Sequence, residues 1–317
     1  MARVTGTEGG RPVRQVTRGV LALAPRQFWG AGETVVRTAL FLAAALAVVV
    51  TIAIFLALVV DTVPFFARVS PVDFYAGTVW SPDIRGIYGV LPLVAGTLII
   101  AGAGCLIGIP LGLAAAVFLR EYAPARVREV LKPVLEILAG IPTIVYGLFA
   151  LLAIAPVLQT WFGASFFNGA NAILVIGIMI IPMVSSLSED ALTAVPIDLR
   201  DGALALGATH FEATRRVVLP AALSGVVASF ILAFSRAVGE TMIVLIVAGQ
   251  NTDLTLNVFG QMTTMAGWIA KRATGDVAVG ETVYLAMFAV GVTLFLITLV
   301  LNLISDYLRT RFREEYD

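Results

Sequence analysis

Long runs of apolar residues constrain this chain more than any other feature of its sequence. Several of them exceed the roughly 18 residues that indicate a membrane-spanning helix. A backbone in lipid must hydrogen-bond to itself, and these runs lack the short alternating pattern of barrel strands. We therefore expect an all-α integral membrane protein with six transmembrane helices, at Val36–Val60, Leu91–Leu119, Val130–Leu158, Ala170–Leu187, Ala221–Ala248 and Thr282–Tyr307.

Charged residues are scarce and unevenly placed. They make up 13% of the 317 residues, against about a quarter in soluble proteins. Basic residues gather before the first span, between spans two and three, between spans four and five, and after span six. The positive-inside rule then places both termini in the cytoplasm. The opposite side carries only Arg68, Arg85, Lys271 and Arg272.

Cysteine and histidine, which often carry catalysis or bind metals, occur once each. Cys105 is the only cysteine and lies in an apolar run, which excludes a disulfide or a thiolate metal cluster within the chain. His210 is the only histidine, and no Walker A motif is present. We expect no metal, no cofactor and no ATP hydrolysis by this chain itself.

Backbone-breaking residues mark three further features. The loop between spans one and two is rich in proline and aromatic residues, which predicts ordered turns and an aromatic belt at the membrane surface, with a docking surface for an external partner as the alternative. Gly104, Gly108 and Gly112 recur every four residues in span two, which favours close helix packing. The sequence Gly140-Ile141-Pro142 predicts a bend in span three, lining either a pathway or a packing contact.

A polar segment, residues 198–219, separates spans four and five. Asp198 is a good candidate for a helix N-cap, Gly207 for a break, and Thr209 with Glu212 for the capping box of a second helix. We therefore expect two short helices with a bend between them, on the cytoplasmic side. An amphipathic helix lying on the membrane is the alternative.

This segment resembles the coupling motif of binding-protein-dependent ABC transporter permeases. The family pattern is Glu-Ala-Ala, three residues, Gly, nine residues, Ile-x-Leu-Pro. The resemblance implies a type I ABC importer permease fold with cytoplasmic coupling helices, and a segment that docks on a separate ATPase subunit. The matching positions are Asp201, Gly202, Ala203, Gly207, Val217, Leu219 and Pro220.

Span five contains two charged residues within an apolar run, Arg236 and Glu240. A charge at the bilayer centre costs from about 2.5 to over 10 kcal/mol, so such groups face the interior of the bundle. Four residues apart in a helix, they would share one face. Arginine suits oxyanions because its fork of donors is always charged, and Glu240 would hold it when the site is empty. We expect an anion pathway at Arg236 and Glu240 with Ser235 and Thr241; a purely structural ion pair is the alternative.

The sequence Arg236-Ala237-Val238-Gly239-Glu240-Thr241 is similar to the fifth-helix motif of the phosphate-specific transport branch. The sequence Gly140-Ile141-Pro142-Thr143 is similar to its third-helix motif, and the long exported loop to its PstC-type rather than its PstA-type subunit. The resemblance implies an inner-membrane permease for inorganic phosphate. The implied partners are a PstA-type permease, a PstB-type ATPase dimer and a PstS-type binding protein, with lipid around the chain and no nucleic acid.

The resulting organisation has four parts. Residues 1–35 form a basic tail, 36–90 the first span and exported loop, 91–308 a permease core of five spans with the coupling segment, and 309–317 a second tail. Three other functions stay open. They are a permease for sulfate, molybdate or tungstate; a secondary transporter that needs no ATPase; and a membrane scaffold or sensor that transports nothing.

Overall fold

A computed structural model describes residues 30–275 and 277–311 of the chain. It divides into two compact units, residues 1–54 and 55–317. Within the described part of the first unit the chain is helical from Gly30, and this helix, α1, continues into the second unit and ends at Phe66. The expected tail at residues 1–35 lies mostly outside the described residues, as do residues 312–317 of the second tail.

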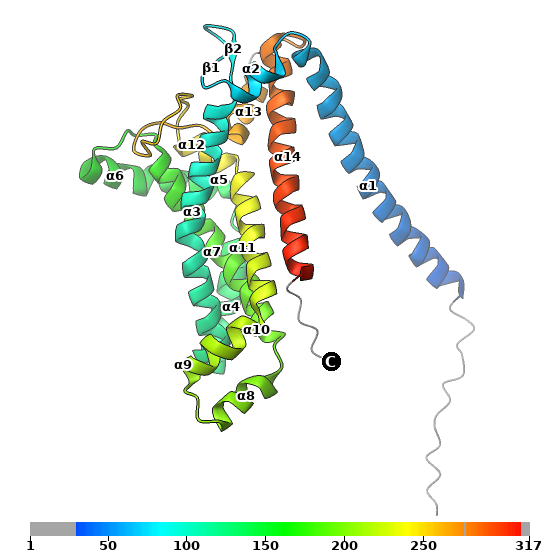
Figure 1. Cartoon of the computed structure of the whole chain (residues 1–317), viewed down its shortest axis with the longest axis vertical. Helices are drawn as coiled ribbons and strands as arrows, with labels where there is room; N and C mark the ends of the chain where they lie inside the picture. Colours follow the sequence, from blue (N-terminus) through cyan, green and yellow to red (C-terminus); the bar gives the residue numbers. More distant parts are fainter. Residues whose placement is uncertain (1–29, 276, 312–317) are drawn as a thin grey trace, which may run out of the picture. The chain divides into compact units, whose positions relative to one another are not determined.

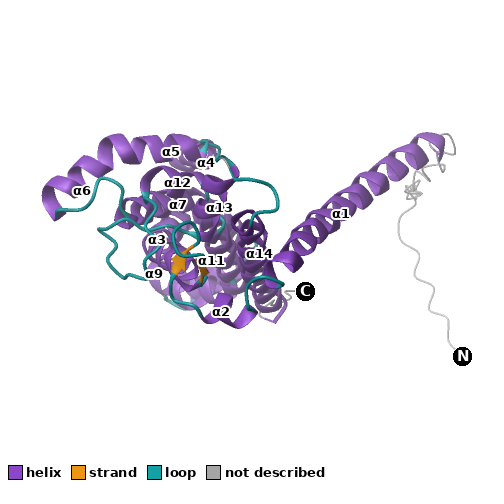
Figure 2. Ribbon diagram, turned by 90° about the horizontal axis from the view of Figure 1, so that it is seen from above, coloured by secondary structure: helices purple, strands orange, loops and turns teal. Residues whose placement is uncertain are grey.

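The second unit is built around a bundle of long helices. Helices α3 (Leu91–Val117), α7 (Gly169–Thr193) and α11 (Leu223–Val238) pack against one another, and α14 (Thr282–Arg311) packs on α11 (Figures 1 and 2). Their facing apolar side chains form the largest core of the unit. The packing predicted for the glycines of span two is confirmed, because a Cβ on Gly108 would lie 2.4 Å from the carbonyl oxygen of Gly177 on α7.

The third predicted span, Val130–Leu158, is wrong in its boundaries. Residues Ala125–Ala139 form a separate amphipathic helix, α4, and the apolar stretch that follows runs from Thr143 to Phe162. It consists of α5 (Thr143–Phe149), a π-helical turn η2 (Ala150–Ile154) and α6 (Ala155–Phe162). Pro142 has no N–H to continue the ladder and disfavours the helical conformation of the residue before it, so the bend predicted there is a full break.

The fifth predicted span, Ala221–Ala248, is also interrupted. Helix α11 ends at Val238, and α12 (Met242–Val247) begins only after three residues that are not helical. After α12 the chain forms a long loop that hydrogen-bonds to residues before and at the start of α7. For example, the N–H of Ser165 donates to the carbonyl of Phe259 at 2.9 Å, and the N–H of Ala170 donates to the carbonyl of Val258 at 2.7 Å. The loop leads to α13 (Met265–Ala273), which precedes α14.

One end of the second unit, here called the hairpin end, carries α2 (Pro71–Ala76), a two-stranded antiparallel hairpin and α13 (Figure 1). The strands β1 (Trp80–Ser81) and β2 (Ile87–Tyr88) pair Trp80 with Tyr88. The predicted ordered turns are therefore present, whereas the predicted aromatic belt is wrong. Phe65, Phe74 and Trp80 are buried in a cluster of edge-to-face rings that also includes Trp268 of α13.

The opposite end, here called the α8 end, carries the polar segment between α7 and α11 (Figure 1). It contains α8 (Ile197–Ala205), α9 (His210–Ala213), a π-helical turn η3 (Thr214–Val218) and α10 (Leu219–Ala221). A second π-helical turn, η1 (Phe118–Tyr122), extends α3 towards it. These elements enclose a small core that joins Leu192 and Val195 to Val218 and Val226.

The all-α prediction for a membrane protein agrees with the fold. Among the described residues, five helical stretches are long and apolar enough to cross a membrane. The number is six if His210–Ala221 and Leu223–Val238, bent by 72° at their junction, are taken as one span. Exposed apolar side chains such as Leu106 and Leu111 on α3 are consistent with contact with lipid.

Candidate functional site

The residues predicted for the anion pathway lie at the break in span five. Arg236 is exposed in the last turn of α11, Ser235 precedes it, and Glu240 follows the helix end. Together with Gly239, Ala139, Met179 and Met183 they line an open pocket of about 530 Å³. The structure therefore brings Arg236, Ser235 and Glu240 to one cavity between α11, α7 and the end of α4.

The predicted pairing of Arg236 with Glu240 on one helix face is wrong. Helix α11 ends before Glu240, and no ion pair within 4.0 Å joins the two among the described residues. The Glu240 carboxylate, 7% exposed, instead accepts the backbone N–H groups of Met242 at 3.0 Å and Ile243 at 3.2 Å. Its charge stabilises the first turn of α12.

Two hydroxyl groups of the predicted site differ in what they bind. Thr241 donates to the carbonyl of Gly239 at 3.2 Å and so supports the break itself. The Ser235 hydroxyl is buried and has no hydrogen-bond partner within the described chain. The pocket thus contains one guanidinium group and one hydroxyl group that are both uncommitted, beside a carboxylate held by the backbone.

The predicted coupling residues lie together at the α8 end. Asp201, Gly202 and Ala203 are on α8, Gly207 follows it, and Leu219 and Pro220 form α10. Gly207 has φ of +88°, a left-handed conformation that favours glycine and confirms the predicted break. Asp198 is not the predicted N-cap, because α8 begins one residue before it, at Ile197 after Pro196.

The capping box predicted at Thr209 is confirmed. The Thr209 hydroxyl accepts the N–H of Glu212 at 3.3 Å, and the Glu212 carboxylate accepts the N–H of Thr209 at 3.0 Å. The backbone and side-chain hydrogen bonds from Thr209 hold the pKa of the Glu212 carboxyl below its usual value. Between the two helices Leu206 is 92% exposed, so this corner presents an apolar side chain outwards.

Two buried carboxylates near α8 were not identified from the sequence. Glu121 in η1, with a side chain 2% exposed, faces Arg200 of α8 at 3.7 Å. Glu189 near the end of α7, 1% exposed, pairs with Arg128 and with Lys132 of α4, the latter at 2.5 Å. Both carboxylates join elements far apart in sequence. The sequence feature that could have identified both is an acidic residue inside an apolar or amphipathic segment.

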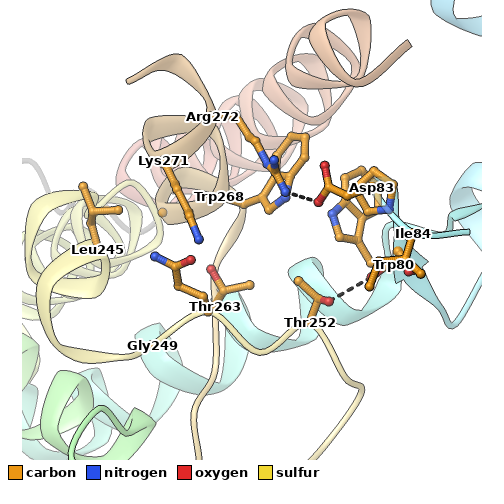
Figure 3. A pocket seen from close by; sticks show the side chains of 14 residues that line it. Trp80, Asp83, Ile84, Leu245, Gly249, Thr252, Thr263, Trp268, Lys271 and Arg272 are labelled. Atoms are coloured by element: carbon orange, nitrogen blue, oxygen red, sulfur yellow. Dashed lines mark hydrogen bonds and ion pairs between the residues drawn. The ribbon is translucent and has the colours of Figure 1, made fainter. Parts of the chain in front are cut away.

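A second pocket, of about 240 Å³, opens at the hairpin end (Figure 3). It lies between the hairpin, the residues after α12, and α13. Arg272 forms an ion pair with Asp83, and the guanidinium of Arg272 lies 5.7 Å from the ring centre of Trp268. The Thr252 hydroxyl donates to the carbonyl of Trp80 at 2.8 Å. Sequence reasoning did not find this pocket, because its walls come from three separated segments.

Residues 108–314 match the family described as binding-protein-dependent transport system inner membrane component. The chain is 34% identical over 259 residues to the phosphate transport system permease protein PstC of Mesorhizobium japonicum, covering 75% of this chain and 78% of that protein. It is 34% identical over 248 residues to the probable ABC transporter permease protein YqgH of Bacillus subtilis, covering 77% and 79%.

Solved structures of ABC transporters share the fold. A chain of a bacterial alginate ABC transporter in complex with its periplasmic protein aligns with a TM-score of 0.61 and 16% identity, covering 90% of this chain and 97% of that chain. A chain of the inward-facing MetNI methionine transporter aligns with a TM-score of 0.52 and 21% identity, covering 71% and 95%. At these identities the likeness concerns the fold alone.

Proposed function

Because this chain belongs to the family of binding-protein-dependent transport system inner membrane components, we propose that it is the permease subunit of an ATP-driven importer of inorganic phosphate. The observation that carries the proposal is the pocket at the break of span five, where Arg236 has no carboxylate partner among the described residues. Relatives named as PstC phosphate permeases support the choice of anion and the PstC type of subunit.

The chemistry of the pocket suits an oxyanion in transit. Arg236 offers several donors in one plane, and charge-assisted hydrogen bonds to phosphate are about twice as strong as neutral ones. Ser235 also lines the pocket, and its buried hydroxyl has no hydrogen-bond partner among the described residues. The Glu240 carboxylate lies at the wall, where it accepts the N–H groups of Met242 and Ile243. Its repulsion limits the affinity, so the anion is able to leave.

The α8 end suits transmission of movement from a separate ATPase. Helix α8 is short, exposes Asp201 and Gly202, and is bounded by the left-handed Gly207. In the proposed complex this end docks on a PstB-type ATPase dimer, which hydrolyses the ATP. A PstA-type permease completes the pathway, and a PstS-type binding protein delivers phosphate to the hairpin end.

The proposed topology follows from these roles. The chain crosses the bacterial inner membrane several times, with the α8 end and both termini in the cytoplasm and the hairpin end outside. Residues 91–308 form the permease core. This arrangement agrees with the excess of basic residues in segments on the α8 side.

Uptake of labelled phosphate tests the proposal directly. In cells that depend on this chain, Arg236→Ala should abolish uptake while co-purification of the partner subunits stays normal. Arg85→Ala is the matched control, because Arg85 is exposed on the hairpin and outside both pockets. Normal uptake by the Arg236→Ala variant would refute the role of Arg236.

Competition experiments decide among the tetrahedral oxyanions. Unlabelled phosphate should displace the label, whereas sulfate, molybdate and tungstate should not at the same concentration. If one of those anions competes better than phosphate, the chain is a permease for that anion instead.

A further inference from the structure

The pocket at the hairpin end has a rigid frame. Trp80 and Trp268 meet edge to face with ring centroids 4.9 Å apart, and the Arg272–Asp83 pair joins α13 to the hairpin. The hydroxyl of Thr252 ties the loop after α12 to the same hairpin. Three segments distant in the sequence are thereby held around one cavity, so its lining groups keep fixed positions.

The charge of this pocket is positive and its free groups are mainly donors. Arg272 and Asp83 neutralise each other, which leaves Lys271, whose ammonium group has no hydrogen bond or ion pair within the described part of the chain. Figure 3 shows Lys271 extending from α13 towards Thr263, on the side of the pocket away from Trp80. Ser81, Thr263 and Gln250 also line the cavity, and their side chains have no hydrogen bond to another side chain among the described residues.

The location of the pocket relates it to the Arg236 site. Leu245, in the second half of α12, and Gly249, two residues after it, line the hairpin-end pocket, and Glu240, two residues before α12, lines the Arg236 pocket. Helix α12 has six residues and is therefore about 9 Å long at 1.5 Å per residue. The two pockets lie at opposite ends of one short helix.

We propose that the hairpin-end pocket is an entry site that binds inorganic phosphate through Lys271 before the anion reaches Arg236. A single ammonium group with neutral donors around it gives a charge-assisted but modest interaction, which suits a site that must pass its ligand on. The position next to α12 favours a transported anion over a carboxylate of a docking protein. That the ligand is phosphate rests on the proposed function. That the pocket suits an anion rests only on its lining groups.

Protection of an introduced cysteine tests this entry site locally. Ser81→Cys puts a thiol in the pocket of the full chain in lipid nanodiscs, and its rate of alkylation by N-ethylmaleimide is measured against inorganic phosphate. The native Cys105 is buried, so its background is small and can be removed with Cys105→Ala. Gln250→Cys, at a second lining position, repeats the measurement, so the result does not depend on whether the Ser81→Cys variant folds.

Phosphate should slow alkylation at both lining positions. Adding Lys271→Gln should raise the phosphate concentration for half-maximal protection about tenfold, the loss expected for one charge-assisted hydrogen bond, and Lys271→Arg should restore it. Arg85→Cys, on the same hairpin but outside the pocket, is the matched control and should show no protection.

Several outcomes would overturn the proposal. They are an absence of protection by phosphate, equal protection at Arg85→Cys, and protection that Lys271→Gln leaves unchanged. Protection by the substrate-binding protein but not by phosphate would assign the pocket to an acidic side chain of that protein instead. Since the assay reads the pocket and not transport, its failure would leave the Arg236 uptake experiment, and hence the proposed function, unaffected.

Discussion

Glu240 uses its carboxylate to hold backbone N–H groups at the start of α12. This arrangement separates two roles that a helical Arg-Glu pair would combine. Arg236 stays available to a ligand, while Glu240 keeps its charge without consuming the guanidinium group. The break in span five therefore has a chemical consequence as well as a geometric one.

Removing the Glu240 side chain should destabilise the chain. Glu240→Ala leaves the N–H groups of Met242 and Ile243 without their acceptor, at a cost of about 1–3 kcal/mol. Glu240→Gln keeps an acceptor oxygen, so it should lower the free energy of unfolding by less than half as much as Glu240→Ala. The melting temperature of the purified chain in detergent measures both variants. An unchanged melting temperature for Glu240→Ala would contradict the capping role.

At the residue scale, the sequence allowed Arg236 and Ser235 to be predicted as a site because a charge in an apolar run is conspicuous. The geometry of Glu240 could not be predicted in this way. The expected position on the face of Arg236 assumed an unbroken helix, and one Gly-Glu-Thr sequence gives no clear signal of a break. The hairpin-end pocket was missed because Lys271 and Ser81 come to line one cavity only through the tertiary fold.

Glycines at the interface of α3 and α7 set how closely these helices approach. A Cβ on Gly108 would lie 2.4 Å from a carbonyl oxygen and from a side-chain carbon of Ile180, whereas one on Gly102 would meet nothing within 4 Å. The same helix thus provides a tight position and an open one. A four-residue spacing of small residues could identify this interface from the sequence, but not its partner helix.

Alanine at the two glycines of α3 should have opposite effects. Gly108→Ala should cost about 1–3 kcal/mol, because α3 and α7 must move apart or strain. Gly102→Ala should leave stability unchanged or raise it slightly, as alanine favours helix over glycine. Thermal unfolding of both variants in the same detergent is the measurement. Equal melting temperatures would show that the interface adapts without cost.

The Glu121–Arg200 contact connects α3, through η1, to α8. Glu121 is almost completely buried, and Nε of Arg200 has no hydrogen bond among the described residues. Without Arg200 the buried Glu121 would keep only Arg120, at 3.9 Å. A buried charge that loses a partner is unfavourable, so the Glu121–Arg200 pair should keep α8 moving together with α3. Neither partner was predicted, since the two lie in different segments and only the fold brings them together.

Breaking this contact should uncouple ATP hydrolysis from uptake. Glu121→Gln and Arg200→Gln should each lower the phosphate taken up per ATP about fivefold, equivalent to about 1 kcal/mol of coupling. The double variant should be no worse than either single variant, because all three lack the same interaction. Arg126→Gln, an exposed change at the same end, is the control. Additive losses would show that the residues act independently.

At the scale of the whole molecule, the proposed function divides the work among three places on one bundle. The hairpin end presents a pocket with a free lysine, the break of span five presents Arg236, and the α8 end presents short exposed helices. The apolar runs were sufficient to predict an all-α membrane fold. The exact spans were only partly predictable: Pro142 indicated a bend but not that the helix stops there, and the break at Gly239 has no clear signal in the sequence.

This division predicts that the chain cannot transport phosphate alone. Purified chain in liposomes, without ATPase, should show no phosphate uptake under a phosphate or proton gradient. Uptake should appear when the partner permease, the ATPase and the binding protein are added with ATP. In this complete complex Gly207→Ala should reduce uptake, because alanine at φ of +88° is strained. Gly102→Ala on α3, with open space around it and outside the α8 end, is the control. Gradient-driven uptake by the chain alone would identify a secondary transporter, and unchanged uptake by a complex lacking the chain would identify a scaffold.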